Sequence, residues 1–232
     1  MASASLFLAL DTATDVPSIA LGVPGEAAAE VRLSGRRELS REIERVVERL
    51  LSARGAAAGD LAGVIVADGP GSFTGLRIGI AFAKGLCRAR DLPLLAGASL
   101  LGAALAASRG EGTVVAEYDA LRGDVYRAVY RLTAGSERAM DRQAGAAGHV
   151  APAERDAARV DVLAPPSLVS RDVPPPAYPD LVRAGAANAS AAALLRLRGF
   201  ARGLSRIDAP DLWEPAYGRL AEAEVRYRAR GR

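Results

Sequence analysis

The chain has 232 residues, of which half are apolar and a quarter are charged, the composition of an ordinary globular protein. Its single cysteine, Cys87, excludes a disulfide framework, and its single histidine, His149, excludes a site built from several histidines. No stretch reaches the ~18 consecutive apolar residues needed to cross a bilayer, and residues 5–10 are too short for a signal peptide. We therefore expect a cytoplasmic protein that does not interact with membranes.

The net charge of +3 and the pI of about 9.3 come from one tail. Residues 219–232 contain five arginines and two glutamates, a difference that equals the whole excess. A short basic terminus is more typical of a solvated end than of an RNA-binding arm. The charge balance therefore gives little support to direct nucleic-acid binding.

The first 108 residues alternate between strand and helix signals. Short apolar runs predict β-strands at 5–10, 18–23, 27–33, 63–67 and 94–98. Apolar residues at helical spacing predict α-helices at 39–51, 76–89 and 100–107. The second of these helices carries only Arg77, Lys84 and Arg88 as charges, so we expect it to be covered on more than one side.

The rest of the chain has a weaker pattern. Residues 113–118 and 124–132 predict a strand pair joined by a turn at Gly123, and 189–202 predicts a last helix. The stretch 134–180 is proline-rich and poorly patterned, and we expect part of it to be extended surface chain. This order of strands and helices indicates an α/β protein with two lobes. The lobes are predicted to span residues 1–108 and 109–232.

The most distinctive segment reads DGPGSFTGLR, from Asp68 to Arg77, between a predicted buried strand and a helix. Glycines permit close backbone approach and amides at a helix N-terminus favour an anion, which together indicate a phosphate-binding loop. The segment lacks both the Gly-Lys-Ser/Thr ending of a P-loop and the glycine spacing of a dinucleotide fingerprint. A tight strand-to-helix turn that packs against a neighbouring surface fits the residues equally well.

Other polar turns also allow two interpretations. Asp11, Thr12 and Thr14 follow the first strand, where they either hold Mg²⁺ or phosphate or form an Asx/ST turn, and the spacing favours the turn. Residues 119–126, DALRGDVY, either supply an acid or form a polar hairpin bend, and we favour the bend. Cys87 lies on an apolar helix face and is expected to be a packing residue. No Gly-x-Ser-x-Gly nucleophile elbow occurs.

Three segments together resemble one protein family. LALDTAT, DGPGSFTGLRIGIAFAKGL and DALRGDVY are similar, in order and spacing over residues 6–130, to the TsaB (YeaZ) family of tRNA threonylcarbamoyladenosine biosynthesis proteins. Residues 214–219, EPAYGR, resemble the family's C-terminal Pro-x-Tyr-x-Arg element. Two positions depart from the family: Leu39 stands where histidine is usual, and Leu121 stands where arginine is common.

The resemblance implies an α/β fold of the actin-like class (acetate and sugar kinase/Hsp70/actin), with two lobes of which the second is reduced. It also implies a non-catalytic role. In this family the related subunit TsaD transfers threonylcarbamoyl to an adenosine of tRNA, the TsaB-type subunit pairs with TsaD, and the ATPase TsaE joins the pair. TsaD-like catalysis needs a histidine-containing metal site, and this chain has only His149.

We therefore expect no metal and no cofactor bound by this chain alone, while ATP or ADP at the boundary between subunits stays open. The resemblance further implies that contact with tRNA is indirect, and that the chain forms a self-dimer when TsaD is absent.

The resemblance implies pairing through the first two helices. The residues expected at this interface are Leu39, Ile43, Val46, Val47, Leu50, Thr74, Arg77, Ile78, Ile80, Ala81 and Lys84. A standard interface buries ~800 Å² per partner, which two helices of this length can supply. Replacing Ile80 or Ala83 by glutamate is then expected to abolish pairing with TsaD and to leave the fold intact.

Two enzymatic functions remain as alternatives. In one, the chain is a kinase or ATPase of the same fold, and a set of turn residues holds ATP and Mg²⁺. In a non-catalytic chain the same set is a vestigial nucleotide loop, consisting of Asp11, Thr12, Thr14, Gly69, Gly71, Ser72 and Gly75. In the other alternative the chain is a peptidase, for which the sequence offers neither a histidine cluster nor a credible nucleophile.

Overall fold

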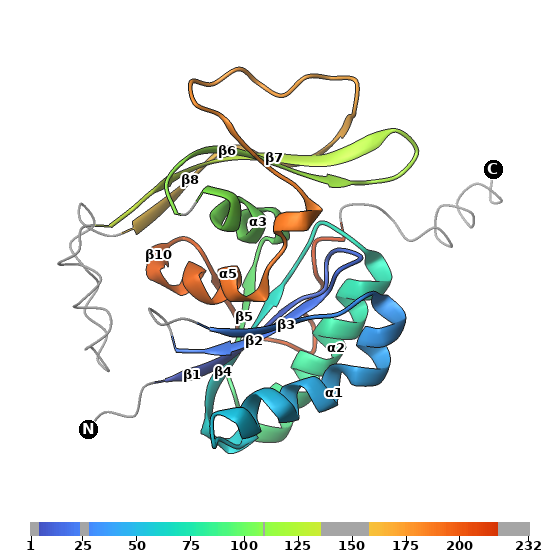
Figure 1. The fold of residues 1–232 in the computed structure, drawn as a ribbon, viewed down its shortest axis with the longest axis vertical. Coiled ribbons are helices and arrows are strands. Elements are labelled where there is room, and N and C mark those ends of the chain that lie inside the picture. The colour runs from blue at the N-terminus through green and yellow to red at the C-terminus, as the bar shows by residue number, and fades with distance from the viewer. Residues whose placement is uncertain (1–4, 24–27, 109, 136–157, 218–232) are drawn as a thin grey trace.

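Two β-sheets lie one above the other in the computed structural model, with helices between them and below them (Figure 1). Helices α3 (Ser99–Ser108) and α5 (Ala191–Arg196) fill the space between the sheets, while α1 (Arg36–Ala53) and α2 (Phe73–Arg90) cover the far face of the lower sheet. The architecture is therefore α/β in four layers. The structure describes residues 5–23, 28–108, 110–135 and 158–217.

The lower sheet has six strands in the order β11-β5-β4-β1-β2-β3, and the upper sheet has five in the order β10-β8-β7-β6-β9. The lower strands are β1 (Leu6–Asp11), β2 (Ser18–Gly22), β3 (Ala29–Arg32), β4 (Leu61–Ala67), β5 (Leu94–Gly97) and β11 (Ser205–Ile207). The upper strands are β6 (Gly112–Asp119), β7 (Asp124–Thr133), β8 (Ala158–Ser170), β9 (Val182–Ala184) and β10 (Phe200–Ala201). Short 3₁₀ helices form at Ala58–Asp60, Ala186–Asn188 and Leu197–Gly199.

Strands β1 and β4 form the parallel centre of the lower sheet. Leu10 pairs with Val66, and both are 1% exposed. The apolar runs that predicted these strands are continuous because helices cover both faces of the sheet. Since the two strands run in the same direction, their carboxyl ends meet at one edge, where Asp11 and Asp68 lie.

The first two helices agree with the sequence prediction and are slightly longer than expected. Ser72 caps α2, because its hydroxyl oxygen accepts a hydrogen bond from the Gly75 N–H (3.2 Å). Asp91 ends α2 in the left-handed conformation, with φ of 52°. No helix in the described part of the chain is long and apolar enough to span a membrane.

The upper sheet contains three strands that the sequence did not reveal, β8, β9 and β10. Strand β8 pairs antiparallel with β7 although it falls in the proline-rich stretch. Its pattern is hidden because Pro165 and Pro166 interrupt it and much of its C-terminal half is exposed. The last helix is also shorter than the predicted 189–202. It ends at Arg196, and Phe200 already pairs with β8.

The chain returns to the lower sheet after β9. The Ser190 hydroxyl donates a hydrogen bond to Glu30 Oε1 (2.9 Å), and the Ala191 N–H donates one to Ser18 Oγ (2.8 Å). These bonds tie the start of α5 to β2 and β3. Strand β11 then pairs antiparallel with β5 at the edge of the same sheet. The division of the chain into lobes at residue 108 stays a prediction.

Candidate functional site

Two turns meet at the carboxyl edge of the lower sheet, one after β1 and one between β4 and α2. The Ser72 N–H donates a hydrogen bond to the Ala13 carbonyl (2.7 Å). A Cβ on Gly71 would overlap the carbonyl oxygen of Ala13, and a Cβ on Gly75 would overlap that of Thr12. Both glycines are therefore needed for the two turns to pack against each other.

The turn after β1 has the internal hydrogen bonds of an Asx/ST turn. The Ala13 N–H donates to Asp11 Oδ1 (3.2 Å), and Thr14 Oγ1 accepts from the Val16 N–H (3.3 Å). Asp11, Thr12 and Thr14 are all buried. These hydrogen bonds form the turn that the spacing favours.

Three amides of the glycine-rich turn are bonded within the chain. The Gly69 N–H donates to Ser99 Oγ (3.0 Å), the Gly75 N–H to Ser72 Oγ and the Ser72 N–H to the Ala13 carbonyl. A phosphate-binding loop directs its amides at the anion, whereas these amides face protein oxygens. The turn therefore fits a packing role better than a phosphate-binding role. A nucleotide at a boundary with another subunit stays a prediction.

Two carboxyl groups lie at this edge, of which Asp11 is buried and Asp68 is half-buried. Burial raises the pKa of each to about 6, although backbone hydrogen bonds from Ala13 and Ser190 oppose the rise at Asp11. Asp11 Oδ2 has no hydrogen-bond partner among the described residues. Asp68 is not among the predicted site residues, although its place directly after a buried strand is a visible signal. Both carboxyl groups therefore hold their protons to higher pH than an ordinary aspartate does.

The interface residues predicted on α1 lie in the core of this chain. They are 0–7% exposed, and they are Leu39, Ile43, Val46, Val47 and Leu50. The outer side of α1 carries exposed charges instead, such as Arg41, Glu44 and Glu48. The apolar residues therefore hold α1 on the sheet, and their contact with a partner stays a prediction.

The residues of α2 divide between the core and the surface. Ile80 is 4% exposed and Ala83 is 0% exposed. A glutamate at either position would place an unpaired charge in the core, so the expectation that such variants keep their fold is wrong. Five other predicted residues of α2 are exposed or half-buried: Thr74, Arg77, Ile78, Ala81 and Lys84.

One narrow stripe of α2 faces solvent along the helix. Successive residues of an α-helix turn by ~100°, so Thr74, Ile78, Ala81 and Gly85 line up opposite the buried side; Ile78 is half-buried against the core and the other three are exposed. We call these four residues the α2 stripe. A Cβ on Gly85 would meet nothing within 4 Å, although glycine inside a helix costs about 1 kcal/mol relative to alanine. Nothing within the described chain requires this glycine, which the sequence analysis did not select.

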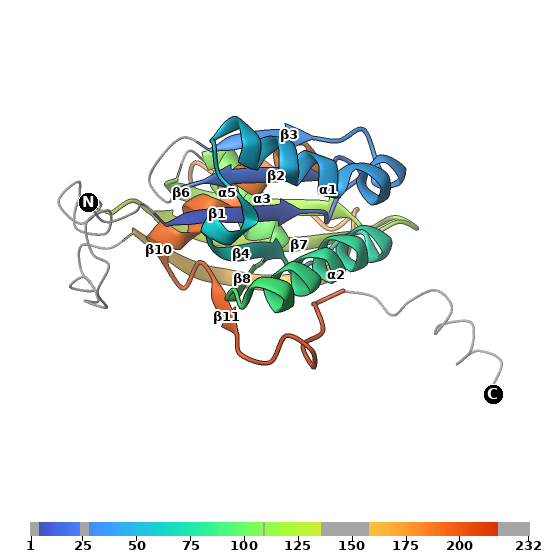
Figure 2. The ribbon, with the colours of Figure 1, turned by 90° about the horizontal axis from the view of Figure 1, so that it is seen from below.

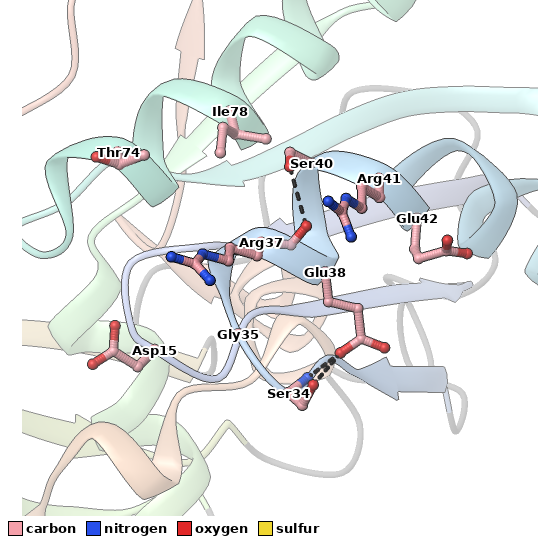
Figure 3. Close-up of a pocket in the computed structure, with 10 residues that line it drawn as sticks. All are labelled: Asp15, Ser34, Gly35, Arg37, Glu38, Ser40, Arg41, Glu42, Thr74 and Ile78. Atoms are coloured by element: carbon pink, nitrogen blue, oxygen red, sulfur yellow. Dashed lines mark hydrogen bonds between the residues drawn. The ribbon is translucent and has the colours of Figure 1, made fainter.

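A broad open groove borders the N-terminal half of the α2 stripe (Figure 3). Its volume is about 1010 Å³, and it is lined by the turn after β1, the start of α1, and Thr74 and Ile78 of α2. Glu38 on the α1 side is held by Ser34, whose N–H (2.6 Å) and hydroxyl both donate to Glu38 Oε2. The groove separates the first turns of the two helices and gives the stripe a polar border on this side.

Residues 209–217, which we call the strap, run alongside α2 on its other side (Figure 2). Lys84 Nζ donates a hydrogen bond to the Trp213 carbonyl (2.7 Å) and lies 5.6 Å from the centre of the Trp213 ring. Arg88 forms an ion pair with Asp211 (3.5 Å). Sequence reasoning missed these contacts because their partners lie more than a hundred residues apart in the chain.

The third polar segment forms the bend of the β6–β7 hairpin, as we favoured. Asp119 Oδ1 accepts hydrogen bonds from the Leu121 N–H (2.9 Å) and from Arg171 (2.8 Å). No three histidine, cysteine, aspartate or glutamate side chains of the described residues are grouped as metal ligands. His149 lies outside the described residues.

Comparisons with known proteins identify relatives of this chain. A family model described as TsaD, tRNA N6-adenosine threonylcarbamoyltransferase, matches residues 29–195, more than half of the chain. The tRNA threonylcarbamoyladenosine biosynthesis protein TsaB of Escherichia coli (strain K12) is 39% identical over 126 residues, 53% of this chain and 54% of that protein. TsaB of Bacillus subtilis (strain 168) is 41% identical over 76 residues, 33% of each. The matches thus span about half or less of the curated relatives' length.

Two solved structures are similar in fold. YeaZ from Pseudomonas aeruginosa superposes with a TM-score of 0.60 at 27% identity, covering 78% of this chain and 76% of that chain. A protein described as similar to peptidase YEAZ from Pseudomonas aeruginosa gives a TM-score of 0.66 over 93% of this chain and 100% of that chain, and its 22% identity supports the fold alone. The chain therefore belongs to the TsaD family, tRNA N6-adenosine threonylcarbamoyltransferase, within which it is a TsaB (YeaZ) member with the actin-like α/β fold.

Proposed function

We propose that this chain is a non-catalytic subunit for threonylcarbamoyladenosine biosynthesis in tRNA, which binds and activates a TsaD subunit and has TsaE as third partner. The observation that carries the proposal is the exposed α2 stripe on a chain of the TsaB group. The sequence contains one histidine, fewer than a metal site built from several histidines needs. The proposed role places the protein in the cytoplasm, with tRNA contacted through TsaD.

The α2 stripe has the shape that a second helix requires. Thr74, Ala81 and Gly85 add little bulk, so a partner helix can approach the backbone of α2 closely, and Ile78 adds an apolar contact. Packed helices lie ~8–10 Å apart, and small side chains favour the short end of that range. The buried side chains of α1 fix its position beside α2, so the surface is formed before the partner arrives. When TsaD is absent, the same stripe is available to a second copy of this chain.

Replacing Ala81 by glutamate is expected to weaken binding to TsaD about a hundredfold, because it places a charge between two packed helices. The fold should persist, since Ala81 is exposed and glutamate is a good helix former. Titration calorimetry with purified TsaD measures the affinity, and thermal unfolding of the variant alone checks the fold.

The matched control is Ala53→Glu, the same substitution at an exposed alanine at the end of α1. It should bind TsaD as the unchanged chain does. Equal affinity of the Ala81→Glu variant and the unchanged chain would reject the α2 stripe as the binding surface. So would equal losses in the two variants, because the position of the charge would then be irrelevant.

The ATP-binding alternative has one observation in its favour. Asp11 and Asp68 follow neighbouring parallel strands, and ligands of open α/β sheets bind at the carboxyl ends of such strands. Against it, the amides of Gly69, Ser72 and Gly75 are already bonded within the chain. Calorimetry with ATP and Mg²⁺ decides: micromolar binding with turnover by the isolated chain would support an enzyme and contradict our proposal.

A further inference from the structure

The N-terminus of α5 is held by side chains of the first strands. Helix α5 follows the connection from β9 and packs against β1, β2 and β3 of the lower sheet (Figure 1). The Ala191 N–H donates a hydrogen bond to Ser18 Oγ (2.8 Å) of β2, and the Ala192 N–H donates one to Glu30 Oε1 (3.3 Å) of β3. The first amides of an α-helix have no partner within the helix, so these side chains complete its hydrogen bonding.

Asp11, at the end of β1, belongs to the same contact. Its Oδ1 atom accepts a hydrogen bond from the Ala13 N–H (3.2 Å), and the backbone of Ser190 is also hydrogen-bonded to its carboxyl group. Asp11 is 1% exposed, and within the described part of the chain its Oδ2 atom has no donor. Burial thus removes the hydration of this carboxylate without replacing all of it. We call the contact the α5 junction, which consists of Asp11, Ser18, Glu30 and Ser190.

The charges around Asp11 do not compensate for this loss. Arg32 of β3 attracts the carboxylate, but its Nε forms an ion pair with Glu30 (3.6 Å), and Glu30 itself repels Asp11. Tyr118 of β6 is in electrostatic contact with Asp11, and Asp68 lies at the same edge of the sheet. Strands β2 and β4 and the buried sides of α2, α3 and α5 bring only uncharged side chains. The ionised form of Asp11 is therefore disfavoured while the junction is closed.

The first turn of α5 can leave the junction while the rest of the helix stays in the core. Residues 189–191 at its start are alanine, serine and alanine, and residues 186–187 before them are exposed. The large apolar side chains follow in the second turn, where Leu194, Leu195 and Leu197 are 0–3% exposed. A helix of six residues has little stability of its own, so its first turn depends on the hydrogen bonds of the junction. Opening this turn exposes little apolar surface.

We propose that the α5 junction is a proton-dependent conformational switch: it is most stable when Asp11 is protonated, and loss of the proton favours an opened form in which the first turn of α5 leaves the junction and water reaches Asp11. In the closed form, burial raises the pKa of Asp11 from 3.8 to about 6. The stability of the closed form is therefore fully present below the pKa of the hydrated carboxyl, and it is lost as pH rises through the pKa of the closed form. This inference does not depend on the proposed function.

Hydrogen exchange of the Ala191 amide measures the opening, because its acceptor, the Ser18 hydroxyl, does not titrate in this range. We expect its protection factor, corrected for the intrinsic pH dependence of exchange, to fall about fiftyfold between pH 4 and pH 7.5. Low concentrations of urea should leave it unchanged, because a local opening exposes little surface, whereas amides of β6 and β7 should follow global unfolding. A protection factor that is independent of pH, or one that follows β7 in urea, would overturn the inference.

Replacing Asp11 by asparagine should make the protection of the Ala191 amide nearly independent of pH. The matched control is Glu30→Gln, which removes the other carboxyl group of the junction and keeps an oxygen that can accept from Ala192. This control should retain the pH dependence of the unchanged chain. A dependence that persists in Asp11→Asn, or that is lost in Glu30→Gln, would mean that Asp11 is not the controlling group. If Asp11→Asn does not fold, the Glu30→Gln variant and the unchanged chain decide by the same criterion.

Discussion

Replacing Gly75 by alanine is expected to lower the free energy of unfolding by about 3 kcal/mol or more. The new Cβ would overlap the carbonyl oxygen of Thr12, a backbone atom in the buried turn after β1, so one of the two turns has to move. The matched control is Gly85→Ala on the same helix, where nothing lies within 4 Å. That variant should gain up to about 1 kcal/mol. Urea unfolding followed by circular dichroism measures both differences.

The comparison separates a packing role of the glycine-rich turn from a phosphate-binding role. If the turn has a packing role, the Gly75→Ala variant loses stability even when no nucleotide is present. A Gly75→Ala variant that unfolds like the unchanged chain, yet loses affinity for ATP, would show that the turn binds phosphate and that the packing interpretation is wrong.

Replacing Asp11 by asparagine is expected to stabilise the protein at pH 7.5 by about 3 kcal/mol and to have little effect near pH 4. Burial raises the pKa of Asp11 from its ordinary value of 3.8 to about 6 in the folded state. Between pH 3.8 and about pH 6, Asp11 is therefore protonated in the folded chain and ionised in the unfolded chain. The stability of the unchanged chain is therefore greatest below the unfolded pKa and is lost as pH rises through the folded pKa.

Asparagine is neutral throughout this range and keeps an oxygen that can accept the hydrogen bond from the Ala13 N–H. Urea unfolding of both proteins from pH 4 to pH 8 gives the difference, and other titrating groups cancel in it. Asp68, whose pKa is also raised to about 6 by burial, retains its own pH dependence in both proteins. A difference that is constant across this pH range would contradict the burial of an ionisable Asp11.

The sequence predicted strands β1 to β5 of the lower sheet and the helices α1 and α2 that cover it, and it missed the edge strand β11. Strands β1 and β4 are continuous apolar runs, and α1 repeats apolar residues at helical spacing up to Leu51. Strand β8 lacks such a pattern, since Pro165 and Pro166 interrupt it and few of its residues are buried. Local patterns therefore identified the elements that bury a regular face, and missed the interrupted strand β8 and the short strands β9, β10 and β11.

The candidate site was harder to predict because periodicity does not say which side of a helix is covered. The spacing of the apolar residues of α1, such as Leu39 and Ile43, fits both a partner interface and a hydrophobic core. In the structure these residues lie in the core. The stripe on α2 became visible only when the strap and α1 were seen to cover its flanks. The two glycines inside the predicted helix gave no guide either, because Gly79 is buried against Thr12 whereas Gly85 is exposed.

The central claim is that this chain activates a TsaD subunit through α2 and performs no chemistry of its own. Reconstitution of tRNA modification from TsaD, TsaE, tRNA and the threonylcarbamoyl donor tests it most directly. We predict modified tRNA when the unchanged chain or the Ala53→Glu variant is present, and almost none when the chain is omitted or carries Ala81→Glu. Equal modification with and without the chain, or modification by the chain without TsaD, would contradict the account.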